Sequence, residues 1–121
     1  SESGQVYSTQ TGRYIKTGKQ VTAWGQVTLS TLGTITGTVQ IEGLPFTSGS
    51  SSARGVLSMG YWAAMTTNTF VDFSGLVTAS TSVATIYGKS SANGTGTATI
   101  AQADLSATTD FVFVVLYEAV N

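Results

Sequence analysis

The stretch DFVFVVLYEAV, residues 110–120, decides the fold, because the seven consecutive positions from Phe111 to Tyr117 are all apolar or aromatic. It is too short for a membrane-spanning helix, which needs about 20 apolar residues. Its β-branched and aromatic residues favour a strand. Successive side chains of a strand point to opposite faces, so both faces of this strand are apolar. Both faces therefore need cover, from another layer of the same chain or from another chain.

We expect one face of this strand to fill the core of the monomer and the other to meet neighbouring chains, although the two roles can be exchanged. The first face consists of Phe111, Phe113, Val115 and Tyr117, and the second of Val112, Val114 and Leu116. Full burial of the three side chains on the second face contributes about 5 to 9 kcal/mol. That is comparable with the net stability of a whole domain, about 5 to 15 kcal/mol, so exposure of this face to water is disfavoured.

The composition indicates one β domain of 121 residues, rich in Ser, Thr and Gly and with a single Pro. We expect residues 1–10 to form a loose segment or a short first strand and residues 11–121 to form the domain. Because the chain opens on Ser rather than Met, we also expect a fragment or a processed product. The lack of Cys argues against a disulfide-built secreted module. Five basic residues form no stripe that would neutralise phosphates, so nucleic acid is not expected as a partner. No membrane insertion is expected either.

The apolar pattern predicts about eight strands and no helix beyond a single turn in AQADLS, residues 101–106. Residues 21–30 alternate clearly, with Trp24 on the polar face opposite Val21 and Val27. Further strands are expected at residues 13–18, ending in a turn at Gly18-Lys19, and at 38–42, 53–65, 69–77 and 82–90. Residues 92–105 hold Asn93-Gly94, a strong signal for a hairpin turn. Turn signals 8 to 12 residues apart indicate a sandwich, a jelly roll or a barrel.

Simple alternation along residues 53–65 groups Tyr61 with Leu57 and Met59 and places Trp62 on the other face. One of the two adjacent rings is expected in the core, and the other in an interface or an open groove. Exposed flat rings with amide and carboxylate neighbours are typical of sugar sites. We therefore expect a glycan site formed by Trp62, Tyr87, Asn68 and Asp72, while core or subunit contact is the simpler explanation of each ring. For Trp24, the candidates are a ligand, a neighbouring subunit or a folded-back loop.

The lack of both His and Cys excludes Ser-His-Asp and Cys-His catalysis and removes the usual zinc ligands. No run of acidic residues predicts a calcium site, and Gly94-Thr95-Gly96 has no following helix to form a dinucleotide site. We expect no metal and no cofactor. The acids Glu42, Asp72, Asp104, Asp110 and Glu118 form no recognisable pair for glycoside hydrolysis. Asp104 and Asp110 are expected to serve turns beside the last strand, and the protein is not expected to be an enzyme.

Three segments resemble motifs from carboxy-terminal domains of bacteriophage tailspikes and tail fibres. GRYIKTGKQVTAWGQVTL, residues 12–29, resembles an opening of the form Gly-x-Tyr-x-Lys-apolar-Gly, with Thr17 where the motif has Ile or Val. IEGLPF, residues 41–46, resembles an apolar-x-Gly-Leu-Pro-aromatic corner. TTDFVFVVLYEA, residues 108–119, is similar to the aromatic final strand of the family.

The resemblance implies an antiparallel β-sandwich of jelly-roll type, with three copies around a threefold axis. Val112, Val114, Leu116 and Trp24 would then form the trimer interface. The expected function is trimerisation and host-surface glycan binding, with a bacterial surface polysaccharide as partner. The expected location is the tail of a virion assembled in the host cytoplasm. The alternatives are a stand-alone carbohydrate-binding module, a capsid-like or cytokine-like jelly roll, and a polysaccharide hydrolase with a carboxylate pair completed across a subunit boundary. No catalytic residue is carried over from the family.

Overall fold

The computed structural model describes residues 2–35, 37–50, 55–66, 70–91 and 96–120. Within these ranges the chain forms ten β-strands and one short 3-10 helix, η1. The elements are β1 Glu2–Ser3, β2 Val6–Thr17, β3 Gln20–Thr31, β4 Thr34–Ile35, β5 Gln40–Ile41, β6 Val56–Ala63, β7 Phe70–Val77, β8 Ala84–Ser90, β9 Thr97–Thr99, η1 Gln102–Asp104 and β10 Asp110–Glu118. No helix in these ranges is long and apolar enough to cross a membrane.

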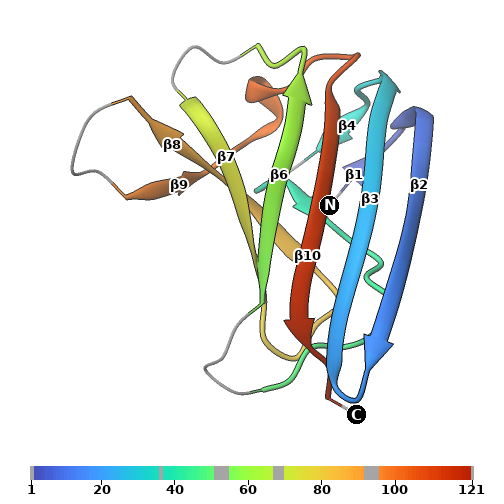
Figure 1. Cartoon of the computed structure of the whole chain (residues 1–121). Helices are drawn as coiled ribbons and strands as arrows, with labels where there is room; N and C mark the ends of the chain where they lie inside the picture. Colours follow the sequence, from blue (N-terminus) through green and yellow to red (C-terminus); the bar gives the residue numbers. More distant parts are fainter. Residues whose placement is uncertain (1, 36, 51–54, 67–69, 92–95, 121) are drawn as a thin grey trace.

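All strand pairs between the described elements are antiparallel. One curled sheet has the order β2-β3-β10-β6-β7-β8-β5, with β9 paired to β8, and a two-stranded sheet joins β1 to β4. The strand β10 lies between β3 and β6, in the middle of the broad wall that Figure 1 shows face on. The predicted all-β antiparallel class is therefore confirmed, and the jelly-roll topology stays a prediction.

The inner face of β10 fills the core, as its alternation predicts. Phe111, Phe113, Val115 and Tyr117 are all at most 8 % exposed. They pack against apolar side chains from most other elements, including Val21, Leu57, Phe73, Ile86, Ile100 and Leu105. Removal of this apolar surface from water supplies the main favourable free energy of folding.

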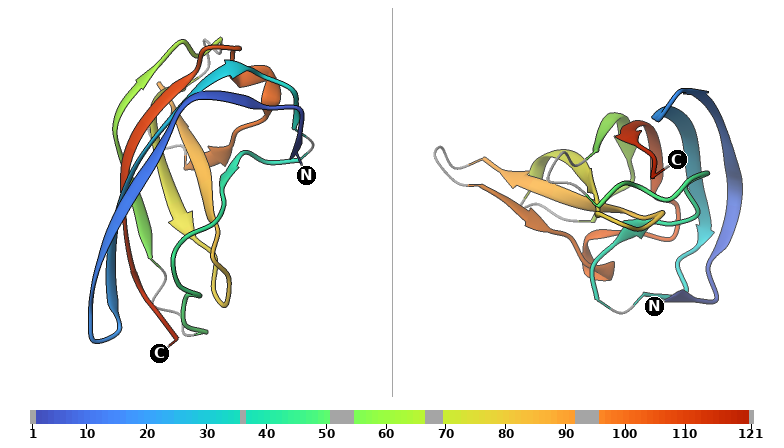
Figure 2. Two further views of the ribbon diagram at one scale, coloured as in Figure 1. Left: turned by 90° about the vertical axis from the view of Figure 1, so that its right-hand side faces the viewer. Right: turned by 90° about the horizontal axis from the view of Figure 1, so that it is seen from below.

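The segment 37–50 covers the core from the side opposite to β2, β3 and β10, as Figure 2 shows. The backbone of Val39 ties it to the core: its N–H donates to the carbonyl oxygen of Ile100 at 3.0 Å, and its carbonyl oxygen accepts from the N–H of Ile86 at 3.1 Å. The Gln102 side chain of η1 accepts from the N–H of Ile35 at 2.9 Å and donates to the carbonyl oxygen of Gly33 at 3.1 Å. The turn predicted at 101–106 is confirmed as η1, whereas β5 occupies only part of the predicted strand 38–42.

The two predicted hairpins are present. Strands β2 and β3 join at Gly18-Lys19, where Gly18 has a φ of +60°, a region that glycine enters without steric cost. The strand β2 is longer than predicted, since residues 6–12 also pair with β3. Strands β8 and β9 pair as a hairpin, while its predicted turn at Asn93-Gly94 lies outside the described residues.

A β-bulge in β6 changes which side chains face the core. Met59 lies opposite Phe113, but the next pair along β10 joins Val112 to Tyr61, so Gly60 is the extra residue. One extra residue reverses the alternation of a strand. The predicted grouping of Tyr61 with Met59 is therefore wrong, and Tyr61 lies on the outer face of the sheet.

Candidate functional site

The face of the sheet turned away from the core exposes a cluster of apolar side chains. In the register of the strands, Trp24 lies opposite Val114, and Tyr61 lies opposite Val112. We call the cluster the outer patch, and it consists of Ile15, Trp24, Val56, Tyr61, Val112, Val114 and Leu116. Six of its members are between 37 and 60 % exposed, and Val114 is half-buried.

Among the described residues, the charges near the outer patch lie at its margins. Arg13 lies beside Trp24 on the edge strand β2, and Glu118 follows Leu116 on the same face of β10. At the other end, a carboxylate oxygen of Asp110 accepts a hydrogen bond from the Thr28 hydroxyl at 2.8 Å. A contiguous apolar area rimmed by polar groups is typical of an interaction surface.

All four residues predicted for the interface, Trp24, Val112, Val114 and Leu116, lie together on this face. Their alternation with buried residues placed them there, and the pairing of β3 with β10 brings Trp24 next to Val114. The described part of the chain leaves Trp24, Val112 and Leu116 exposed. Their contact with a neighbouring chain stays a prediction.

A second feature lies on the opposite side of the same strands. Two adjoining hollows, of about 110 and 340 Å³, lie between the inner face of the β2–β3 hairpin and residues 39–45. Both hollows are lined by Gln10, Val27, Ile41 and Glu42, so we treat them as one groove and call it the interlayer cleft. A concavity of this size is within the range of small-molecule sites, about 300 to 1,000 Å³.

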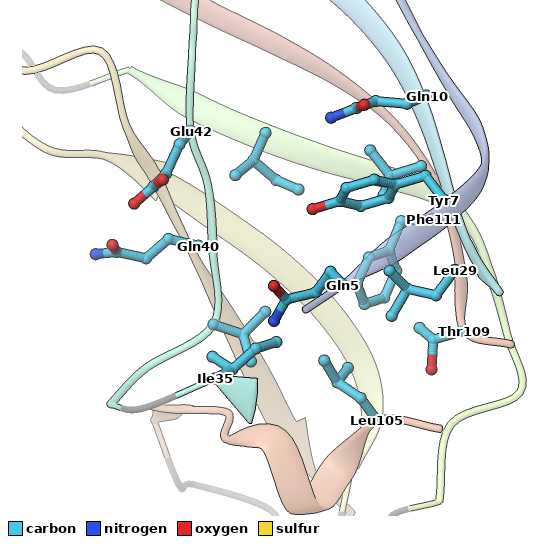
Figure 3. A pocket seen from close by; sticks show the side chains of 13 residues that line it. Gln5, Tyr7, Gln10, Leu29, Ile35, Gln40, Glu42, Leu105, Thr109 and Phe111 are labelled. Carbon is cyan, nitrogen blue, oxygen red and sulfur yellow. The ribbon is translucent and has the colours of Figure 1, made fainter. Parts of the chain in front are cut away.

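Polar side chains line the wall of the interlayer cleft on the side of β2. Figure 3 shows Gln5, Tyr7 and Gln10 with their polar ends directed toward the 39–42 segment, while the polar ends of Gln40 and Glu42 turn away from them at the rim. The Gln5 amide donates to the carbonyl oxygen of Thr34 at 3.1 Å, which holds its side chain in place. Within the described residues, the side chains of Gln10 and Glu42 have no hydrogen-bond partner. The cleft therefore offers an amide that is ready to bind a polar ligand.

The floor and the far end of the interlayer cleft are apolar and aromatic. Gly25 lets the ring of Phe113 lie directly against β3, because a Cβ at Gly25 would be 2.6 Å from a ring carbon. At the far end, the rings of Tyr14 and Phe46 meet edge to face with their centroids 5.2 Å apart. The Lys16 ammonium lies 5.3 Å from the Phe46 ring centroid, a cation–π contact that closes this end.

One tyrosine fixes the corner that forms the far wall. The Tyr117 hydroxyl donates to the carbonyl oxygen of Phe46 at 2.9 Å and accepts from the N–H of the same residue at 3.1 Å. Burial raises the pKa of Tyr117 above its ordinary value of 10.0, and the hydrogen bond to the Phe46 backbone opposes this shift. The contact joins β10 to the IEGLPF corner, whose residues Gly43, Leu44 and Pro45 line the cleft.

The residues predicted to bind glycan are not brought together on one face. The Trp62 ring packs edge to face on the core residue Phe73, with their centroids 5.2 Å apart. Asp72 and Tyr87 belong to the opposite face of β7 and β8. Asn68 lies outside the described residues. Their role in glycan binding stays a prediction.

Two of the acidic side chains make hydrogen bonds that support local structure. A carboxylate oxygen of Asp104 accepts from the N–H of Ala101 at 2.9 Å and closes η1, the turn role that the sequence predicts. Asp110 begins β10 and bonds to β3 instead. Across the described ranges, no three His, Cys, Asp or Glu side chains group in a way that could hold a metal ion.

The sequence reasoning missed the polar wall of the interlayer cleft. Gln5, Tyr7 and Gln10 fall in a stretch without apolar alternation, for which the sequence predicts only a loose segment or a short first strand. The pairing of Tyr7 with Leu29 and of Gln10 with Val27 turns both side chains inward. No local pattern in this stretch indicates that pairing, since irregularities of register interrupt it between Val6 and Thr9.

Comparisons with known proteins bear on the fold. No family model matches the chain, and no curated protein matches its sequence. Among solved structures, it is similar to the crystal structure of the Dettilon tailspike protein (gp208), with a TM-score of 0.78 and 19 % sequence identity. The match covers 97 % of this chain and 22 % of that chain, so the chain spans about a fifth of the tailspike's length. The fold of this chain is therefore one that also occurs within a tailspike protein.

Proposed function

We propose that the chain is a non-enzymatic domain of a phage tailspike or tail fibre that forms a homotrimer and binds a glycan of the host surface. The observation that carries this proposal is the outer patch, an apolar area across β2, β3, β10 and β6 that the described part of the chain leaves exposed. The tailspike-like fold and the three sequence motifs support a place in the virion tail, with assembly in the host cytoplasm.

Copies of the same chain are the occupants that fit the outer patch best. Its seven side chains carry no charge, and the described charges at its margins, Arg13, Glu118 and Asp110, include both signs. Two or more copies can therefore approach without an accumulation of like charge. An assembly that binds only folded chains stabilises them by mass action. Three such patches around one axis close a ring in which every copy covers its neighbour.

The absence of catalysis is part of the proposal. A glycoside hydrolase of the usual kind needs two carboxyl groups about 5 to 10 Å apart on either side of the scissile bond. Of the described residues that line the interlayer cleft, Glu42 is the one carboxylate. This favours binding over cleavage. A trimer that binds one sugar unit per chain gains avidity from three linked sites.

The native mass of the chain, measured by light scattering after size exclusion, tests the trimer. We expect three chain masses for the parent and one for Leu116→Asp, because a charge placed in the patch would be buried without a partner. Ser58→Arg should have the same effect, since Ser58 is exposed and lies opposite Val114 on the outer face.

Thr97→Asp is the matched control, because Thr97 is exposed on β9 and lies outside the outer patch. This variant should keep the parental mass, and circular dichroism should show the same β content in all variants. A parent that is monomeric at micromolar concentration would overturn the proposal and favour a stand-alone carbohydrate-binding module. Trimers formed by both Leu116→Asp and Ser58→Arg would contradict the assignment of the outer patch.

A further inference from the structure

We propose that the interlayer cleft is the glycan site and that it binds a neutral hexose unit. This inference rests on the glycan half of the proposed function and names the residues and the class of sugar. It replaces a flat aromatic site with a groove between two layers of the fold. The site lies on the inner side of β2 and β3, so a neighbour on the outer patch leaves it open.

The lining of the interlayer cleft matches the two kinds of surface that a pyranose presents. Hydroxyl groups project around the edge of such a ring, and C–H groups cover its faces. The Gln10 amide can donate to one hydroxyl and accept from another, and the Tyr7 phenol and the Gln5 amide lie on the same wall. The floor, with Val27 and Phe113, offers apolar surface to the face of the ring.

A purely apolar occupant fits this wall less well. A hydrocarbon side chain from another protein would bury the Gln10 amide without a partner, and an unsatisfied buried polar group costs about 1 to 3 kcal/mol. Hydroxyl groups of a sugar satisfy that amide and can be reached through the open rim, where Glu42 lies. The mixture of free amide and apolar floor therefore favours a polyhydroxylated ligand.

The charges of the interlayer cleft select among sugars. Glu42 and Arg13 are the charged residues among the described ones that line it, while Lys16 lies at its far end against the Phe46 ring. The strand register places the Arg13 side chain on the outer face, beside Trp24. The carboxylate at the rim then repels uronic acids and other anionic units, since like charges close together raise the free energy of the bound state. The expected ligand is a neutral hexose segment.

Saturation-transfer NMR and amide shift mapping on the intact assembled protein test the site. The probes are neutral hexose tetrasaccharides of gluco, galacto and manno configuration, and uronate-containing tetrasaccharides of the same length. We expect a neutral tetrasaccharide to bind and to shift the amide signals of Gly12, Gly25 and Gly43. The uronates should bind the parent more weakly than the neutral tetrasaccharides do. This difference in affinity should be smaller in Glu42→Gln, which lacks the negative charge.

Two variants remove the polar wall with little change in volume. Gln10→Leu and Tyr7→Phe should each weaken binding about tenfold, the effect of one or two lost hydrogen bonds. The matched control is Gln20→Leu, because Gln20 is exposed on β3 and lies outside the cleft. The control should bind like the parent, and all three variants should keep the parental mass.

The outcomes separate this inference from the proposed function. If sugar binding shifts the signals of Tyr87 and Asp72, and if Gln10→Leu binds with full affinity, the assignment of the cleft as the glycan site is overturned. Glycan binding by the protein would still stand. A trimer that binds none of the neutral probes would overturn both the inference and the glycan half of the function, but not trimerisation. Protection of the Gly12 and Gly43 amides in the sugar-free trimer would show that a neighbouring chain fills the cleft, which would also overturn the inference.

Discussion

Tyr117 connects two layers of the molecule through a single hydroxyl group. The hydroxyl pairs with both the N–H and the carbonyl oxygen of Phe46. In Tyr117→Phe the ring still fills the core, but both backbone groups of Phe46 lose their partner. We expect the free energy of unfolding to fall by about 1 to 3 kcal/mol, measured by urea denaturation. Tyr61→Phe is the control, because Tyr61 is exposed. It should change the free energy of unfolding by less than about 0.5 kcal/mol.

The same phenol makes the stability depend on alkaline pH. Because burial raises its pKa in the folded protein, the folded state holds the proton more tightly than the unfolded state, whose phenol titrates near 10.0. The stabilisation is fully present below that pH and is lost as the pH rises through the higher folded pKa. We expect the free energy of unfolding to decline above pH 10.0 in the parent and to decline less steeply in Tyr117→Phe. Equal slopes in the two proteins would contradict this account.

At the scale of elements, β6 depends on a residue without a side chain at its start. Gly55 is buried where the chain enters β6, and a Cβ there would lie 2.6 Å from the carbonyl oxygen of Leu116. Because the obstacle is backbone of β10, Gly55→Ala must separate the two strands. We expect the melting temperature to fall by several degrees, as for a loss of about 1 to 3 kcal/mol in a domain of this size.

The control for this prediction is Gly96→Ala, because Gly96 has open space around its Cβ position. It should melt within about 1 or 2 °C of the parent, the effect of an ordinary surface substitution. If Gly55→Ala also melts like the parent, the close approach of β6 to β10 at this point is wrong.

Strands with a regular pattern were predictable from the sequence, and irregular ones were not. The alternation in residues 21–30 and 110–120 located β3 and β10 and sorted their faces, including the position of Trp24. The bulge at Gly60 arises from the register between β6 and β10, which no local pattern encodes. The first half of β2 has polar side chains on both faces, so its pairing with β3 had no signal of its own.

At the scale of the whole molecule, the two candidate surfaces differ in how far the sequence could predict them. The outer patch follows largely from alternation, since its members on β3 and β10 alternate with core residues. The interlayer cleft joins residues near positions 5–12, 23–29, 39–45 and 105–113. Only the strand order brings these segments together, and strand order depends on long-range pairing that a single sequence does not display.

The two proposed functions, assembly and glycan binding, use different surfaces of the molecule. The outer patch lies on the face of β2 and β3 that looks away from the core, and the interlayer cleft lies on the face that looks toward it. One hairpin therefore serves both surfaces. Assembly through one face and glycan recognition through the other can occur together, because the two surfaces lie on opposite faces of the hairpin.

The place of β10 in the sheet has a consequence for biosynthesis. This strand follows all the other described strands in the sequence, yet it lies between β3 and β6, and it pairs Glu118 with Gln20, 98 positions away. A nascent chain that has not reached residue 118 leaves β3 and β6 with open hydrogen-bonding edges, which are prone to aggregate. Closure over so long a loop is also slow. A product that terminates before β10 cannot complete the sheet, so this domain can close only after β10 has been synthesised.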